Sequence, residues 1–181
     1  MFIAFSSAAI VSIHGQSAPS AFKQNSGIQI GGLGSVFQPD YAGNGAGTGP
    51  QRLYGAGAYA DVSFNRWATI EAEARWMHFN EFHGIYQNTY SIGPRIPIVT
   101  FHRITPYGKV LIGWGSMSAA DLTGKALAFT YGAGVDYRLS RRITVRIIDY
   151  EYQQWRVVNF ENQPDDLYPN GGSVGISYRI F

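Results

Sequence analysis

Within residues 68–78, apolar and polar side chains alternate from Ala68 to Trp76. The even positions hold Ala68, Ile70, Ala72, Ala74 and Trp76, and the odd positions hold Thr69, Glu71, Glu73 and Arg75. A β-strand sends successive side chains to opposite faces. One face of this segment is therefore apolar, and the other carries two carboxylates and a guanidinium. The same alternation recurs along the chain, so the fold must accommodate both a charged face and an apolar face.

Composition narrows the fold class further. Charged residues make up 14% of the chain, against roughly 25% in ordinary soluble domains. Aromatic residues reach 15%, and there are 22 glycines, which suits an all-β protein whose outer surface is not fully aqueous. No apolar run approaches the ~20 residues of a membrane helix. A net charge of +2 argues against a nucleic-acid partner. The absence of cysteine excludes disulfides, thiolate zinc sites and a thiol nucleophile.

Eight segments carry the strand pattern, each near the ~9–11 residues of a tilted membrane strand or slightly longer. They are residues 27–38, 53–64, 67–79, 87–98, 104–117, 126–139, 143–155 and 171–181. Short connections (65–66, 99–103, 140–142) alternate with longer ones (39–52, 80–86, 118–125, 156–170). This order predicts an eight-stranded antiparallel up-and-down barrel, with all short turns and both termini at one end, as in transmembrane barrels.

In each strand, the alternate positions that carry the charged residues form one face. If this face points into the barrel, its residues form a network of ion pairs there. Its members are Asp61, Glu71, Glu73, Arg75, Arg95, Lys109, Asp136, Arg138, Arg146, Asp149 and Glu151. Five cations nearly balance six anions, as a narrow interior requires, because an unpaired charge in a low dielectric is very costly. Eight strands enclose just enough room for side chains. The step from Arg146 to Asp149 breaks the alternation and predicts a β-bulge near Ile147 and Ile148.

The intervening positions of the same strands carry alanine and β-branched residues, and they are predicted to form a lipid-facing surface. Aromatic residues lie towards the strand ends on this face: Phe64, Trp76, Tyr90, Trp114, Tyr137, Tyr152 and Tyr178. Amphipathic rings gather at membrane–water interfaces, so these residues are predicted to form aromatic girdles. A soluble, lipocalin-like barrel with the two faces inverted would show the same alternation. The small size of the apolar side chains and the scarcity of charge favour the membrane interpretation.

The N-terminal segment reads as a remnant of an export signal. Residues 1–21 run from apolar to small and polar side chains without a basic start, which indicates a truncated signal-peptide-like segment. The barrel would then comprise residues 22–181.

No motif indicates catalysis or a bound metal. His78 and His83 beside Glu81 lack the spacing of a zinc site. A lipid-modifying barrel enzyme would need a Ser/His/acid set near the membrane edge, and His78, Ser91 and Glu81 are the candidates, but no local motif supports them. We expect no catalytic residue, metal or cofactor. The arginines of the short turns (Arg66, Arg103, Arg141 and Arg142) either touch phospholipid headgroups or are simply solvated.

Several segments together resemble a known family. They are the hairpin of residues 54–76, Gly93-Pro94-Arg95, the stretch 106–109, and the closing residues 175–181. Over residues 27–181 the chain resembles small eight-stranded outer-membrane barrels of the OmpA/OmpX type. This resemblance implies the bacterial outer membrane as location, and recognition of the terminal Phe181 by the barrel-assembly machinery.

The sequence thus predicts a monomeric outer-membrane barrel with a structural or adhesive role. Its crowded interior would leave at most a small pore. Expected partners are outer-membrane lipids, the assembly machinery, and an extracellular ligand or host surface reached through the long loops. The alternatives are a lipid-modifying barrel enzyme and a soluble lipocalin-like ligand binder.

Overall fold

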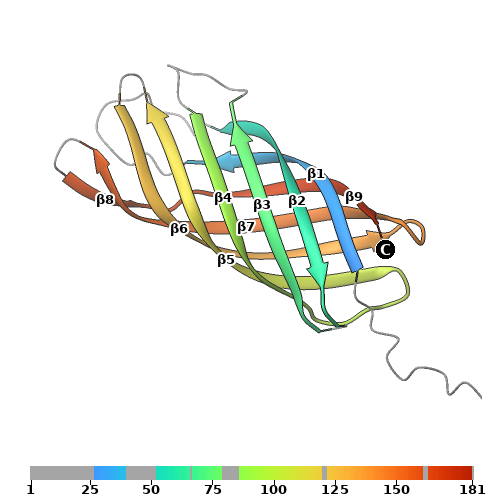
Figure 1. Cartoon of the computed structure of the whole chain (residues 1–181). Helices are drawn as coiled ribbons and strands as arrows, with labels where there is room; N and C mark the ends of the chain where they lie inside the picture. Colours follow the sequence, from blue (N-terminus) through green and yellow to red (C-terminus); the bar gives the residue numbers. More distant parts are fainter. Residues whose placement is uncertain are drawn as a thin grey trace, which may run out of the picture.

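The chain forms a closed antiparallel β-barrel (Figure 1). The computed structural model describes residues 27–39, 52–65, 67–78, 86–119, 122–160 and 163–180, with only the backbone described at 119, 122–123, 157–160 and 163–165. The strands are β1 (Gly27–Gln38), β2 (Leu53–Ser63), β3 (Thr69–Met77), β4 (Tyr86–Pro97), β5 (Ile104–Ala119), β6 (Leu122–Arg138), β7 (Ile143–Phe160), β8 (Gln163–Leu167) and β9 (Asn170–Arg179). No helix among these residues is long and apolar enough to cross a membrane.

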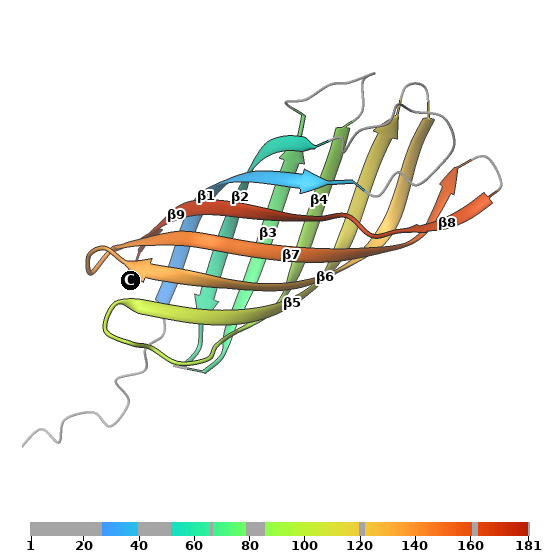
Figure 2. The ribbon, with the colours of Figure 1, turned by 180° about the vertical axis from the view of Figure 1, so that it is seen from behind.

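Eight of the strands make the barrel wall. From β1 to β7 each strand pairs with the next along the chain, and β9 closes the ring between β7 and β1. The remaining strand, β8, pairs only with the far end of β7. Figure 2 shows this end of β7 and β8 projecting beyond the wall. The predicted fold class is therefore confirmed.

Two of the predicted long loops were placed wrongly. The β5–β6 ladder continues to the pair Ala119 and Leu122, so residues 118–125 are mostly strand. Residues 156–170 likewise continue β7 and form β8. In the β5–β6 extension, the paired residues Ser116 and Lys125 have the outward parity of Trp114, whereas Met117 and Gly124 face inwards. Polar residues are thus outside and apolar residues inside in this extension, which is the reverse of the pattern used to find the strands.

The predicted bulge in β7 is confirmed. Val135 pairs with Ile148, whereas the next residue, Asp136, pairs with Arg146. The extra residue lets Ile147 and Ile148 both point outwards, while Arg146 and Asp149 are both fully buried. The bulge thus explains why the alternation breaks in the sequence while Arg146 and Asp149 still face the same interior.

The barrel is polar inside and apolar outside. Glu71 and Arg146 expose 0% of their surface, whereas Ile92 and Ile176 on the outer face expose 52% and 55%. Pro94 lies on the outer face of β4, where the β4–β5 register omits both Gly93 and Pro94. Proline has no backbone N–H to donate, and the β4–β5 pairing is interrupted at this position, so no hydrogen bond is required from it.

The short turns are fixed by side chains that cap the backbone. Asn65 Oδ1 accepts hydrogen bonds from the amides of Trp67 and Ala68, at 2.7 and 2.8 Å. Ser140 Oγ does the same for Arg142 and Ile143, at 3.2 and 3.0 Å. Short polar side chains stabilise tight turns in this way. The last strand, β9, also ends at the short-turn end of the barrel (Figure 1).

Candidate functional site in the barrel interior

Glycines opposite the charged residues make room for the interior network. Glu71 pairs across the sheet with Gly93, and Lys109 pairs with Gly132. Gly132 in turn pairs with Glu151, so one glycine separates Lys109 from Glu151 in the same row of the wall. A Cβ at Gly132 would lie 2.8 Å from Lys109 Cε. The lysine side chain therefore crosses the space that a larger residue would fill.

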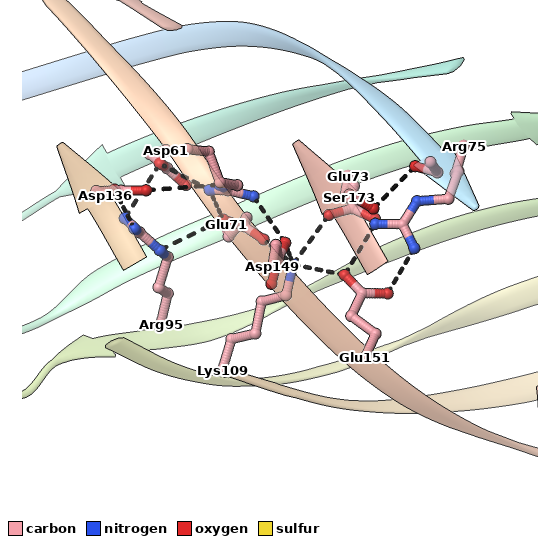
Figure 3. Close-up of polar contacts among 12 residues, drawn as sticks. Asp61, Glu71, Glu73, Arg75, Arg95, Lys109, Asp136, Asp149, Glu151 and Ser173 are labelled. Carbon is pink, nitrogen blue, oxygen red and sulfur yellow. Dashed lines mark hydrogen bonds and ion pairs between the residues drawn. The ribbon is translucent and has the colours of Figure 1, made fainter. Parts of the chain in front are cut away.

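Lys109 is the centre of the network (Figure 3). Its ammonium lies 2.8 Å from Glu71 Oε1, 3.0 Å from Glu73 Oε2, 2.6 Å from Asp149 Oδ2 and 2.6 Å from Glu151 Oε1. The side chain of Lys109 is fully buried. A buried charge is tolerated only when it is paired and hydrogen-bonded. Four carboxylates from β3 and β7 provide that pairing for one lysine of β5.

Arg75 forms the second part of the network, nearer the long-loop end. It donates two parallel hydrogen bonds to Glu151, at 2.7 and 2.9 Å. It also contacts Glu73 Oε1 at 2.5 Å, and its guanidinium lies 4.6 Å from the ring centre of Phe37. The fork-shaped guanidinium matches a carboxylate with two bonds. Arg75 therefore fixes Glu151 in an orientation that also serves Lys109.

Two arginines form the third part, nearer the short turns. Arg146 contacts Glu71 at 2.6 Å and Asp149 at 3.2 Å. Arg95 contacts Asp61 at 3.3 Å and also binds Asp136. Both guanidiniums stack on aromatic rings: Arg95 lies 3.7 Å from the ring centre of Tyr107, and Arg146 lies 3.9 Å from that of Tyr59. Such stacking on an aromatic face adds to the stability of a buried guanidinium.

One predicted member of the interior network lies elsewhere. Arg138 is exposed at the end of β6, and no ion pair among the described residues joins it to the network. Its parity is inward, but it is the last residue of its strand, where the interior opens to solvent. Without it, the interior holds four cations and six carboxyls rather than a near balance. The four are Arg75, Arg95, Lys109 and Arg146, and the six are Asp61, Glu71, Glu73, Asp136, Asp149 and Glu151.

An apolar layer above the charges was missed from the sequence. It consists of two clusters at the long-loop ends of the strands: Phe37, Leu53 and Met77, and Met117, Ala126, Ala128 and Trp155. We call these residues the apolar cap. All expose 5% or less of their surface. They lie at the same alternate positions of their strands as the inward-pointing charged residues. Extending this alternation to each strand end would have identified them from the sequence.

A chain of hydrogen bonds joins the apolar cap to the charges. Trp155 Nε1 donates to Gln153 Oε1 at 3.0 Å, and Gln153 Nε2 donates to Glu151 Oε2 at 3.2 Å. A Cβ at Gly115 would meet the indole of Trp155. Buried side chains thus extend through the interior from the apolar cap to the ion pairs, and these hydrogen bonds connect the two.

Three carboxylates of the network approach closely enough to hold a metal ion. Glu71, Glu73 and Asp149 place ligand oxygens within 4.8 Å of one another. The ammonium of Lys109 contacts all three of these carboxylates. The lysine therefore supplies the positive charge that a metal would otherwise bring.

Comparison with known proteins identifies the family. Residues 4–179 match the family described as outer membrane protein beta-barrel domain. The chain belongs to this family. The protein is accordingly an integral protein of the bacterial outer membrane.

Solved structures of outer-membrane barrels share the fold. Neisserial surface protein A is 11% identical with a TM-score of 0.63, covering 83% of this chain and 96% of that one. The N-terminal barrel of Pseudomonas aeruginosa OprF is 14% identical with a TM-score of 0.57, covering 87% and 98%. P. aeruginosa OprG is 14% identical with a TM-score of 0.52, covering 87% and 97%. Among curated protein sequences, none matches the chain.

In this outer-membrane barrel, the residues assigned to the aromatic girdles lie on the outer face, although Tyr152 is near the middle of β7 because that strand continues to Phe160. Phe64, Trp76, Tyr90, Trp114, Tyr152 and Tyr178 are exposed, and Tyr137 is half-buried. Trp76 Nε1 donates to the hydroxyl of Tyr90 at 2.9 Å, and their rings meet edge to face. Phe181 and the segment 1–21 lie outside the described residues.

The geometry does not assemble the residues considered for a lipid-modifying enzyme. His78 is exposed at the end of β3, where Nε2 is hydrogen-bonded to Asn88 at 2.7 Å and the ring stacks on Tyr86. Ser91 is buried and faces the interior. The two side chains therefore lie on opposite faces of the sheet. Glu81 lies outside the described residues.

Proposed function

We propose that this outer-membrane barrel works through its surface rather than through its interior. It would act as a rigid element of the membrane that presents its long connections, including the β7–β8 hairpin, to an extracellular ligand or host surface. The observation that supports this proposal is the number of buried side chains that point into the barrel. A buried network of ion pairs and the apolar cap occupy the barrel one above the other.

The proposal includes a role without catalysis and at most a small pore. The buried carboxylates that could act as acids or bases are bound to Lys109, Arg75, Arg95 or Arg146. A carboxylate held by a cation inside a closed barrel has no path to a lipid or sugar substrate. Outer-membrane lipids and the assembly machinery complete the proposed partners.

Conductance tests the closed interior. The refolded full chain in a planar bilayer should give no sustained current, or only a small one. The double variant Lys109→Ala with Trp155→Ala, where heat-modifiable mobility shows that it has folded, should raise the current by removing the central lysine and the tryptophan of the apolar cap. Lys125→Ala, which removes an exposed side chain of β6, is the matched control. A large, steady current from the unmodified protein would contradict the proposal.

Adhesion tests the surface role. A non-adherent bacterium that expresses the chain should bind a host-cell monolayer more than the same strain carrying the empty vector. Replacing residues 157–166 with a two-residue turn should reduce binding. Retained heat-modifiable mobility on a detergent gel would show that the shortened barrel still folds. Equal adhesion by the vector control would reject an adhesive role while leaving the conductance result intact.

A further inference from the structure

Arginines gather on one sector of the short-turn end of the barrel. We call them the arginine rim: Arg103, Arg138, Arg141, Arg142 and Arg179. The backbone amide of Arg138 donates to the carbonyl of Arg103 at 2.7 Å, and that of Arg179 donates to the carbonyl of Arg142 at 2.7 Å. The rim therefore runs continuously across the neighbouring ends of β5, β6, β7 and β9.

The arginine rim lacks the carboxylate partners that the interior cations have. Residues 98–103, 138–142 and 179–180 contain no Asp or Glu. The closest carboxylate along β6, Asp136, is bound by Arg95 and Arg146. Among the described residues no ion pair includes a rim arginine. Arginines on neighbouring strand ends without a carboxylate partner favour an anion from outside the chain.

Large apolar side chains lie directly beside the rim. Ile98 and Phe101 each expose 63% of their surface, and Leu139 exposes 53%. The guanidinium of Arg142 donates to the hydroxyl of Tyr178, at 2.9 Å, on the lipid-facing wall. This arginine thus lies along the membrane side of the barrel rather than extending from its mouth. A cation above an apolar surface fits the boundary between lipid tails and headgroups.

We propose that the arginine rim binds the phosphate groups of anionic phospholipids in the periplasmic leaflet. In outer-membrane barrels the short turns face the periplasm, so the rim lies at the depth of those headgroups. The exposed Arg103, Arg141 and Arg142 supply most of the positive charge, while Ile98, Phe101 and Leu139 meet the upper acyl chains. A soluble acidic polymer would use the charge but would leave these apolar side chains in water. This inference is independent of the adhesive role proposed above.

Native mass spectrometry tests the proposal. The full chain in a zwitterionic detergent is titrated with dioleoyl phosphatidylglycerol and, separately, with dioleoyl phosphatidylcholine. We expect phosphatidylglycerol to bind at least tenfold more tightly. Each basic residue at an anionic lipid surface contributes about fivefold. The triple variant R103Q/R141Q/R142Q should therefore lose most of this preference.

A matched variant separates the rim from general surface charge. R52Q/K125Q/R156Q removes three exposed cations at the opposite end, and it should change binding less than twofold. Both variants are checked for folding by heat-modifiable mobility. If the rim variant fails to fold, Tyr178→Phe, which removes the partner of Arg142, should still weaken phosphatidylglycerol binding about twofold or more.

Three results would overturn the proposal. The first is equal loss of lipid binding in both triple variants. The second is displacement of phosphatidylglycerol by an equal concentration of free glycerol phosphate, which would make the rim a site for soluble phosphate. The third is tighter binding of soluble polyglutamate than of phosphatidylglycerol, which would indicate an acidic macromolecule as partner.

Discussion

Replacement of Lys109 by methionine should be among the most damaging single changes in the barrel. Methionine nearly preserves the volume of lysine but removes an ammonium that contacts four carboxylates at 2.6–3.0 Å. Removing one partner of a buried ion pair costs about 3–5 kcal/mol, because the remaining charge is left uncompensated. Here three cations would remain for six carboxyls, so we expect Lys109→Met to lower the free energy of unfolding by at least that amount.

The measurement is urea unfolding of the barrel in phospholipid vesicles, followed by tryptophan fluorescence. Lys125→Met is the control, because Lys125 is exposed, and changes at exposed charges cost less than about 1 kcal/mol. Adding Glu73→Gln to Lys109→Met should restore part of the loss, since it removes one of the uncompensated carboxyls. A loss below about 1 kcal/mol for Lys109→Met, equal to that of the control, would refute the reasoning.

Three further changes test other parts of the barrel. Ala72→Arg places a cation on the lipid-facing wall and should cost about 2–4 kcal/mol in the same assay, whereas Ala72→Leu should be nearly neutral. Gly115→Ala should cost about 1–3 kcal/mol by forcing a Cβ into an indole of β7, whereas Gly34→Ala, with open space around it, should not. Arg75→Lys keeps the charge but loses the bidentate bond to its β7 carboxylate, which should cost about 1.5–3 kcal/mol.

The direction of side chains was readable from the sequence because alternation records which face of a strand is wet. Glu71 and Arg146 were thereby assigned to the interior, and Ile70 and Val145 to the lipid. Alternation does not record depth along the barrel. Arg138 shares the inward parity of Asp136, yet it lies two residues further along β6 and is exposed. A position at a strand end needs the strand boundary as well as the parity.

The partners inside the barrel could not be read from the sequence. Lys109 and Glu151 meet because both lie in one row with Gly132 between them. That row depends on the stagger between β5, β6 and β7, which one sequence does not reveal. The apolar cap was missed for a different reason. The rule of polar residues inside fails near the long-loop end, where Met77 and Trp155 pack against other side chains rather than against charges.

The bulge in β7 shows how strictly the interior charges fix the register. A shift of one residue moves every later side chain of a strand to the opposite face. Deleting Ile147 would leave Arg146 and Asp149 inside with Ile148 alone between them, which matches the existing pairs with β6 and β9. Deleting Tyr150 would instead turn Glu151 towards lipid and deprive Lys109 of a buried partner. We therefore expect heat-modifiable mobility and outer-membrane recovery to survive the first deletion and to be lost with the second. The reverse outcome would mean that the bulge, rather than the placement of charges, sets the register.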